Sequence, residues 1–145
     1  MRETLFRGKR EDNGEWVIGY LVRGKDYLYE NEMTTIFSTD TIFYPYTETS
    51  GYNRVIPKTI GQFTGRCDEN YNKIFEGDIL EVSYDDGTAY ITEVCAYGGT
   101  LCVDVEGEDY DFTAIDFAVD IWKNNCCECK VIGNIYDNPE LLEEL

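Results

Sequence analysis

Short apolar segments bounded by turn residues follow one another along most of the chain, and this pattern predicts a mainly β protein. In residues 5–22, LFRGKREDNGEWVIGYLV, two such segments flank Asp12-Asn13-Gly14. Because Asn-Gly is a strong signal for the turn of a β-hairpin, we expect a hairpin here. Gly24 to Asp26 predicts the next turn, and the β-prone segments YLYE, TTIFS and TIFYPY follow it.

Residues 73–107 predict a β-meander. The segments KIFEGDILEVSY, TAYITEVCAY and TLCVDVEG are separated by Asp85 to Gly87 and by Gly98-Gly99. If Gly98 and Gly99 form a two-residue turn, Cys95 lies opposite Cys102. One face of that hairpin is then apolar and the other is not, which supports the register. The apolar face carries Val94, Ala96, Leu101, Val103 and Val105, and the other carries Glu93, Cys95, Cys102 and Asp104.

Residues 112–122, FTAIDFAVDIW, fit two patterns. A helix places four apolar residues in one stripe, with Thr113 and Asp116 as a capping box. A strand alternates apolar with acidic or small residues, and it also accounts for Phe117 and Ile121, which the helical stripe leaves out. We therefore favour a strand and keep the helix as the alternative. The helical stripe is Phe112, Ile115, Val119 and Trp122, and the strand face is Ile115, Phe117, Val119 and Ile121.

The end of the chain predicts a strand, KVIGNIY, and then a short helix in DNPELLEEL, where Pro139 suits the first helical position. The polar segment TETSGYN, residues 47–53, is the best candidate for a linker. We therefore expect an N-terminal β-hairpin region in residues 1–53. Residues 54–145 are expected to form a β-barrel with a C-terminal helix, and one continuous domain remains the alternative.

The charge of the chain limits its partners. A net charge of −17, from 29 acidic and 12 basic residues, disfavours direct binding to nucleic acid or to an anionic membrane. Solubility is the favoured interpretation of this charge, and a surface that attracts basic partners or imitates a nucleic-acid backbone is the alternative. The sequence MRETLFRGKRED contains no apolar targeting segment, and no apolar run reaches the length of a membrane helix, so we expect a cytoplasmic protein.

The chain contains no histidine and six cysteines. The first fact excludes every mechanism that uses imidazole as base, acid or metal ligand. In a cytoplasmic protein the cysteines are expected to be thiols. Cys95, Cys102, Cys126 and Cys129 are candidate zinc ligands, and Cys126 with Cys129 forms a C-x-x-C motif. Ordinary thiols are the favoured interpretation, because the carboxylates of Glu93 and Asp104 beside the first pair oppose thiolate formation.

The stretch GQFTGRCDENYNKIFEGDIL, residues 61–80, gathers glycines, amides and carboxylates. Asp68, Glu76 and Asp78 are candidate oxygen ligands for Mg²⁺ or Ca²⁺ in a metal-dependent enzyme. The spacing does not match an EF-hand, and an aspartate in a turn commonly accepts hydrogen bonds from loop amides. We therefore expect these residues to shape the corners of the sheet.

Tyrosine is abundant, with 12 in the chain. Tyrosines are favoured at protein interfaces, because they cover apolar area and keep a polar tip. Exposure at an interface and partial burial in the sheet are both open for the candidates Tyr27, Tyr29, Tyr44, Tyr46, Tyr84, Tyr90 and Tyr97.

Three stretches together resemble the YopX family, small proteins encoded by phages and prophages of Gram-positive bacteria. They are FRGKREDNGEWVIGYLV, VIPKTIGQFTGRCDENYNKIFEGDILEV and VIGNIYDNPELLEEL, about 60 of 145 residues, in order and near both ends. The resemblance implies a mostly β fold with an SH3-like barrel portion, a location inside the infected or lysogenic host, and self-association. It implies no reaction and no catalytic residues.

We therefore expect a non-enzymatic protein without a cofactor that acts through protein–protein contacts and forms homo-oligomers. A basic host protein is a further expected partner, whereas direct contact with nucleic acid or a membrane is not expected. An acidic mimic of nucleic acid that inhibits a DNA-binding protein, and a metal-dependent enzyme, are the alternatives.

Overall fold

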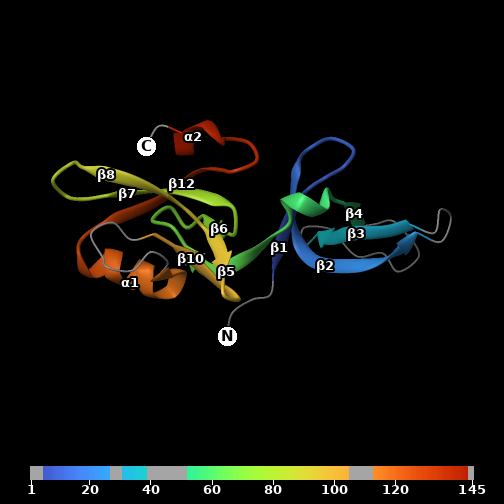
Figure 1. Ribbon diagram of the computed structural model, residues 1–145, viewed down its shortest axis with the longest axis horizontal. Helices are drawn as coiled ribbons and strands as arrows, with labels where there is room; N and C mark the ends of the chain where they lie inside the picture. Colours follow the sequence, from blue (N-terminus) through green and yellow to red (C-terminus); the bar gives the residue numbers. More distant parts are fainter. Residues whose placement is uncertain (1–4, 27–30, 39–51, 105–112, 144–145) are drawn as a thin grey trace. The chain divides into compact units, whose positions relative to one another are not determined.

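A computed structural model describes residues 5–26, 31–38, 52–104 and 113–143, with the side chains of 22–26, 31–38 and 52 excepted. The chain forms two compact units, an N-terminal unit of residues 3–63 and a C-terminal unit of residues 64–145. The sequence-based division into 1–53 and 54–145 stays a prediction. Figure 1 shows the elements of each unit, and the two are described separately.

The N-terminal unit is an antiparallel sheet in the order β4-β3-β2-β1, and β1 also pairs with the start of β5, where Phe6 lies opposite Gln62. Its strands are β1 Phe6–Lys9, β2 Trp16–Asp26, β3 Asn31–Ser38, β4 Tyr52–Arg54 and β5 Gly61–Cys67, with a 3-10 turn, η1, at Pro57–Thr59.

The predicted N-terminal hairpin is confirmed, with Lys9 opposite Trp16. Its loop is longer than two residues: the Arg10 amide donates to the Glu15 carbonyl at 2.9 Å, and Gly14 has φ +72°. The turn predicted at Gly24–Asp26 is wrong, because β2 continues through Asp26, paired with β3. The segments YLYE and TIFYPY lie outside the described residues.

One face of the β1–β2 hairpin is covered by the segment that precedes β5. A side chain at Gly8 would meet the Cβ of buried Val55 at 3.0 Å, so this crossing needs glycine. The Thr59 hydroxyl accepts the Lys9 amide at 2.9 Å and donates to the Ile56 carbonyl at 2.6 Å. The side chains on the other face of the hairpin therefore point away from this covering segment.

The C-terminal unit contains two three-stranded antiparallel sheets, in the orders β12-β7-β8 and β11-β10-β9, and the end of β5 pairs with β6. The strands are β6 Lys73–Phe75, β7 Asp78–Ser83, β8 Ala89–Glu93, β9 Cys95–Tyr97, β10 Thr100–Val103, β11 Thr113–Ala114 and β12 Glu128–Asn134. Val94 links β8 to β9: its amide donates to Asp78 at 2.9 Å, and its carbonyl accepts from Gly77 at 2.8 Å.

The two hairpins of the predicted meander are confirmed, but they lie in different sheets, so the meander is not continuous. Ser83 pairs with Ala89 across the Asp85–Gly87 turn, and Cys95 pairs with Cys102 across Gly98-Gly99. The predicted division of faces is wrong at Ala96, which is exposed, and at Cys102, which is buried. Both faces of β10 are covered, since Leu101, Cys102 and Val103 are all buried.

The strand favoured for residues 112–122 is wrong, because Ile115–Asn124 form a helix, α1. The helical stripe Ile115, Val119 and Trp122 is buried, whereas Phe117, which favoured the strand, is 70% exposed. The predicted capping box does not form: the N-cap is Ala114, and no side chain caps the helix. Phe112 lies outside the described residues.

A single apolar cluster joins α1 to the sheets of the C-terminal unit; its largest members include Ile74, Leu80, Val82, Ile115 and Trp122. The predicted mainly β class and short C-terminal helix, α2 Glu140–Glu143, are confirmed. Among the described residues the sheets are open rather than closed into a barrel, and an SH3-like arrangement stays a prediction. No helix in the described ranges is long and apolar enough to cross a membrane.

Candidate functional site

The loop between β5 and β6 is organised by the buried carboxylate of Asp68. Its Oδ1 accepts the amides of Asn70 and Asn72 at 2.9 and 2.8 Å, and its Oδ2 accepts the amide of Val131 on β12 at 3.0 Å. Burial raises the pKa of Asp68, but these hydrogen bonds outweigh burial and leave the pKa below its ordinary value. Asp68 therefore ties the loop to β12.

The corner between β6 and β7 is built from Glu76-Gly77-Asp78. Gly77 has φ +91°, which other residues resist, and the buried Asp78 accepts the Phe75 amide at 2.7 Å. The structure does not gather Asp68, Glu76 and Asp78 into one site. Within the described ranges, no three Asp, Glu, Cys or His residues are placed to hold a metal ion.

The six cysteines are thiols, as expected. Cys95 and Cys102 lie side by side on β9 and β10, but Cys126 and Cys129 do not complete a ligand cluster with them. Burial raises the pKa of Cys95, and the negative charges of Glu93 and Asp104 raise it further, as predicted. Burial, with Asp68 and Glu69 nearby, raises the pKa of Cys129 to about 12. These shifts oppose the thiolate form that a metal needs.

A cleft of about 340 Å³ lies in the C-terminal unit, between the β5–β6 loop and α1. Trp122 and Val119 supply apolar walls, and Arg66 and Lys123 supply positive charge. Arg66 also pairs with Asp120 at 3.2 Å and with Asp116 at 3.9 Å. The volume is near the lower end for small-molecule sites, but the charges in the cleft have both signs, so the lining favours no ligand class.

Tyr71, which also lines the cleft, was not among the candidates predicted from the sequence. It is 88% exposed and adopts a φ of +64°, which is uncommon for a residue with a side chain. The signal in the sequence was its position between two asparagines in an otherwise polar loop.

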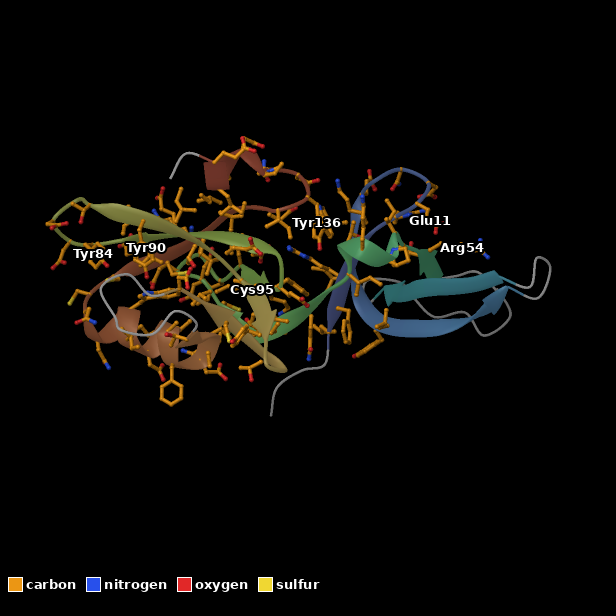
Figure 2. All side chains as sticks on the ribbon, in the orientation of Figure 1. Glu11, Arg54, Tyr84, Tyr90, Cys95 and Tyr136 are labelled. Carbon is orange, nitrogen blue, oxygen red and sulfur yellow. The ribbon has the colours of Figure 1, made fainter. Side chains whose placement is uncertain are left out.

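Tyr84 and Tyr90 are partly buried and pack against the apolar cluster of the C-terminal unit. Figure 2 shows them beside each other on the β7–β8 hairpin, with ring centroids 6.1 Å apart. The Tyr90 hydroxyl accepts the indole N–H of Trp122 at 2.8 Å. Tyr97 is 62% exposed. The other predicted tyrosines, Tyr27, Tyr29, Tyr44 and Tyr46, lie outside the described residues.

The face of the β1–β2 hairpin opposite Val55 combines cations with apolar and aromatic side chains. Arg7 pairs with Ile18 and Lys9 with Trp16, so the four side chains share one face. The Arg7 guanidinium lies 4.7 Å and the Lys9 ammonium 5.7 Å from the centre of the Trp16 ring. Ile18 is 38% and Tyr20 is 56% exposed. We call Arg7, Lys9, Trp16, Ile18 and Tyr20 the hairpin face.

The family model described as YopX protein matches residues 5–143. The chain belongs to the YopX family. Its fold is similar to that of the YopX protein of Bacillus subtilis, with a TM-score of 0.52 and 22% identity over 97% of this chain and 98% of that one. It is also similar to protein EF1440 from Enterococcus faecalis, with a TM-score of 0.56 and 25% identity over 98% and 99%. No protein of curated function matches the chain.

The charge of this YopX-family chain is divided unevenly. Residues 1–63 contain 8 basic and 9 acidic residues, a net charge of −1, whereas residues 64–145 contain 4 basic and 20 acidic residues, a net charge of −16. The boundary is that of the two compact units. The total charge of −17 conceals this asymmetry, which a count by halves would have found from the sequence.

Proposed function

We propose that this YopX-family protein is non-enzymatic, acts through protein–protein contacts and associates with itself. The observation that carries the proposal is the hairpin face, which places cations around an aromatic centre in a chain of net charge −17. Aromatic residues and arginine are enriched at protein interfaces, and complementary charge directs partners to such surfaces. The hairpin face therefore supplies a contact surface that a second copy can complement.

The asymmetry of charge supports self-association in particular. The hairpin face of one copy attracts acidic surfaces. The C-terminal unit of a second copy, residues 64–145, is such a surface, because its net charge is −16. The acids and thiols that were considered as catalytic or metal groups serve the fold or lie apart, so the proposal assigns them no chemistry. A cytoplasmic location in the host stays a prediction.

Size-exclusion chromatography with light scattering tests the proposal. At high micromolar concentration and low salt, we expect a mass that is a multiple of 16.7 kDa. The mass should fall towards that of the monomer in about 1 M salt, where the Debye length shrinks to about 3 Å. A strict monomer at every concentration in low salt would refute self-association.

A second candidate, an acidic mimic of nucleic acid, is favoured by the concentration of 20 acidic residues in residues 64–145. Such a mimic would bind a basic DNA-binding protein of the host. A pull-down from host lysate at low and moderate salt, followed by competition with duplex DNA, tests it. Displacement by DNA would support mimicry, and retention of the partner in excess DNA would contradict it.

A further inference from the structure

We infer that the hairpin face of one copy binds the exposed face of α1 in a second copy, head to tail. The inference rests on the self-association proposed above and names the two surfaces that meet. We call Asp116, Phe117 and Asp120 the helix face.

The helix face lies opposite the buried stripe of α1. Ile115, Val119 and Trp122 are turned towards the core, whereas Asp116, Phe117 and Asp120 are exposed. Phe117 is 70% exposed and stands between two exposed aspartates. Aromatic side chains are enriched at protein interfaces, because they bury a large apolar area.

The carboxylates of the helix face can exchange their partner. Arg66 lies against both Asp116 and Asp120, at 3.9 and 3.2 Å. Ion pairs at a surface are weak enough to rearrange when a partner arrives. The helix face therefore presents an aromatic ring between two carboxylates, in residues 64–145, whose net charge is −16.

The hairpin face has the opposite arrangement. Its aromatic centre is Trp16 with Tyr20, and its charged groups are Arg7 and Lys9. Two surfaces with apolar centres and oppositely charged rims can bury the aromatic rings while their charges pair. The hairpin face does not suit nucleic acid equally well, because the rest of the chain, at −17 overall, repels phosphates.

The two faces are different surfaces of one chain, so their pairing is heterologous. A heterologous contact leaves an unused hairpin face at one end of a dimer and an unused helix face at the other, so association continues until a ring closes or a filament grows. The assembly should therefore contain more than two copies, or a distribution of sizes that grows with concentration.

Charge reversal tests the inference. The hairpin variant Arg7→Glu/Lys9→Glu and the helix variant Asp116→Lys/Asp120→Lys should each associate at least about 100-fold more weakly than the wild type, because like charges then meet. An equimolar mixture of the two variants should associate again, since the acidic hairpin of one meets the basic helix of the other. A chain with all four changes should associate by itself.

Matched controls separate local contact from net charge. Lys58→Glu/Lys73→Glu and Asp85→Lys/Glu128→Lys change the charge by the same amounts at exposed positions outside both faces, and they should retain association. Circular dichroism establishes that each variant folds. If the hairpin charge variant does not fold, Tyr20→Ser and Phe117→Ser remove exposed apolar contacts without altering charge, and each should weaken association.

Three outcomes would overturn the inference. Association of the hairpin and helix variants as strongly as the wild type would place the contact elsewhere and leave self-association intact. A monomeric wild type would refute self-association itself. Tight binding of single-stranded DNA that Arg7→Glu/Lys9→Glu abolishes would assign the hairpin face to nucleic acid instead.

Discussion

Trp16 and Trp122, the two tryptophans of the chain, have opposite surroundings. Trp122 is 3% exposed in the core of the C-terminal unit, and its indole N–H is bonded to Tyr90. Trp16 is half-buried on the hairpin of the N-terminal unit, with Arg7 and Lys9 against its ring. Trp122 stabilises the fold because its apolar surface is buried. Trp16 instead lies at the surface with two cations against its ring.

The different surroundings of the two tryptophans suggest that the C-terminal unit determines the stability of the fold and that the hairpin determines association. The C-terminal unit carries the described apolar cluster around Trp122 and most of the net charge, so its interior holds the fold and its surface attracts cations. The described hairpin of the N-terminal unit supplies those cations. Changes near Trp122 should therefore alter the free energy of unfolding, and changes near Trp16 should alter association.

The largest effect is expected from Trp122→Ala. Removal of a buried indole leaves a cavity and should lower the free energy of unfolding by about 4 kcal/mol. Trp16→Ala, at a half-buried surface position, should lower it by about 1 kcal/mol. Urea denaturation followed by circular dichroism measures both. Equal losses from the two substitutions would remove the contrast between the two tryptophans.

Asp68→Ala should lower the free energy of unfolding by about 3 kcal/mol, because the amides of Asn70, Asn72 and Val131 lose a charged acceptor near the Trp122 cleft. Asp86 is the control: it accepts the amide and hydroxyl of Thr88 in an exposed turn. Asp86→Ala should remain within about 0.5 kcal/mol of the wild type. A loss for Asp86→Ala as large as that for Asp68→Ala would show that burial is not the cause.

The dependence of the free energy of unfolding on pH should also reflect the carboxylate of Asp68. The pKa of Asp68 is lowered in the fold, so its stabilisation is complete above the unfolded value of about 3.9 and is lost as the pH falls through the lower folded value. Burial raises the pKa of Glu93, so its contribution has the opposite sign and is lost as the pH rises. Urea titrations should show a shallower acid slope for Asp68→Asn than for the wild type, and an unchanged slope would contradict this.

Tyr90→Phe should lower the free energy of unfolding by about 1–2 kcal/mol, because it removes the acceptor of the buried Trp122 N–H. Tyr97→Phe, at an exposed position, should leave stability unchanged within about 0.5 kcal/mol. Thermal unfolding distinguishes the two. A neutral Tyr90→Phe would mean that the Trp122 N–H finds another acceptor.

The smallest effect is expected in the quenching of tryptophan fluorescence, measured in variants that keep a single tryptophan. With Trp122→Phe, the remaining Trp16 should be quenched more by iodide than by caesium, because Arg7 and Lys9 attract anions. With Trp16→Phe, the buried Trp122 should respond little to either ion. Equal quenching of Trp16 by both ions would contradict a cationic hairpin face.

Local signals predicted much of the fold. Asn13-Gly14, Asp85 to Gly87 and Gly98-Gly99 located hairpins, because turn residues fix which strands meet and in which register. Helix α1 was mistaken for a strand because Ile115 and Val119 satisfy both periods. The deciding residue, Phe117, is an exposed apolar side chain, and a pattern that assumes apolar residues are buried assigns it wrongly.

Local sequence patterns were also insufficient to predict the contacts of Asp68 and the hairpin face. That Asp68 accepts amides of its own loop followed from the chemistry of turns, but its bond to Val131 joins residues far apart in sequence, which no local pattern specifies. The alternation of Arg7, Lys9, Trp16 and Ile18 is visible in the sequence. The covering of the opposite face of the hairpin by Val55 is a tertiary contact, which that alternation does not specify.

Val94 gives the C-terminal unit a mechanical property. Because β8 and β9 run into each other through this one buried residue, the two sheets cannot separate at this point unless the bonds of Val94 to Gly77 and Asp78 break. The two small sheets should consequently yield together under force, as one event in a single-molecule pulling trace.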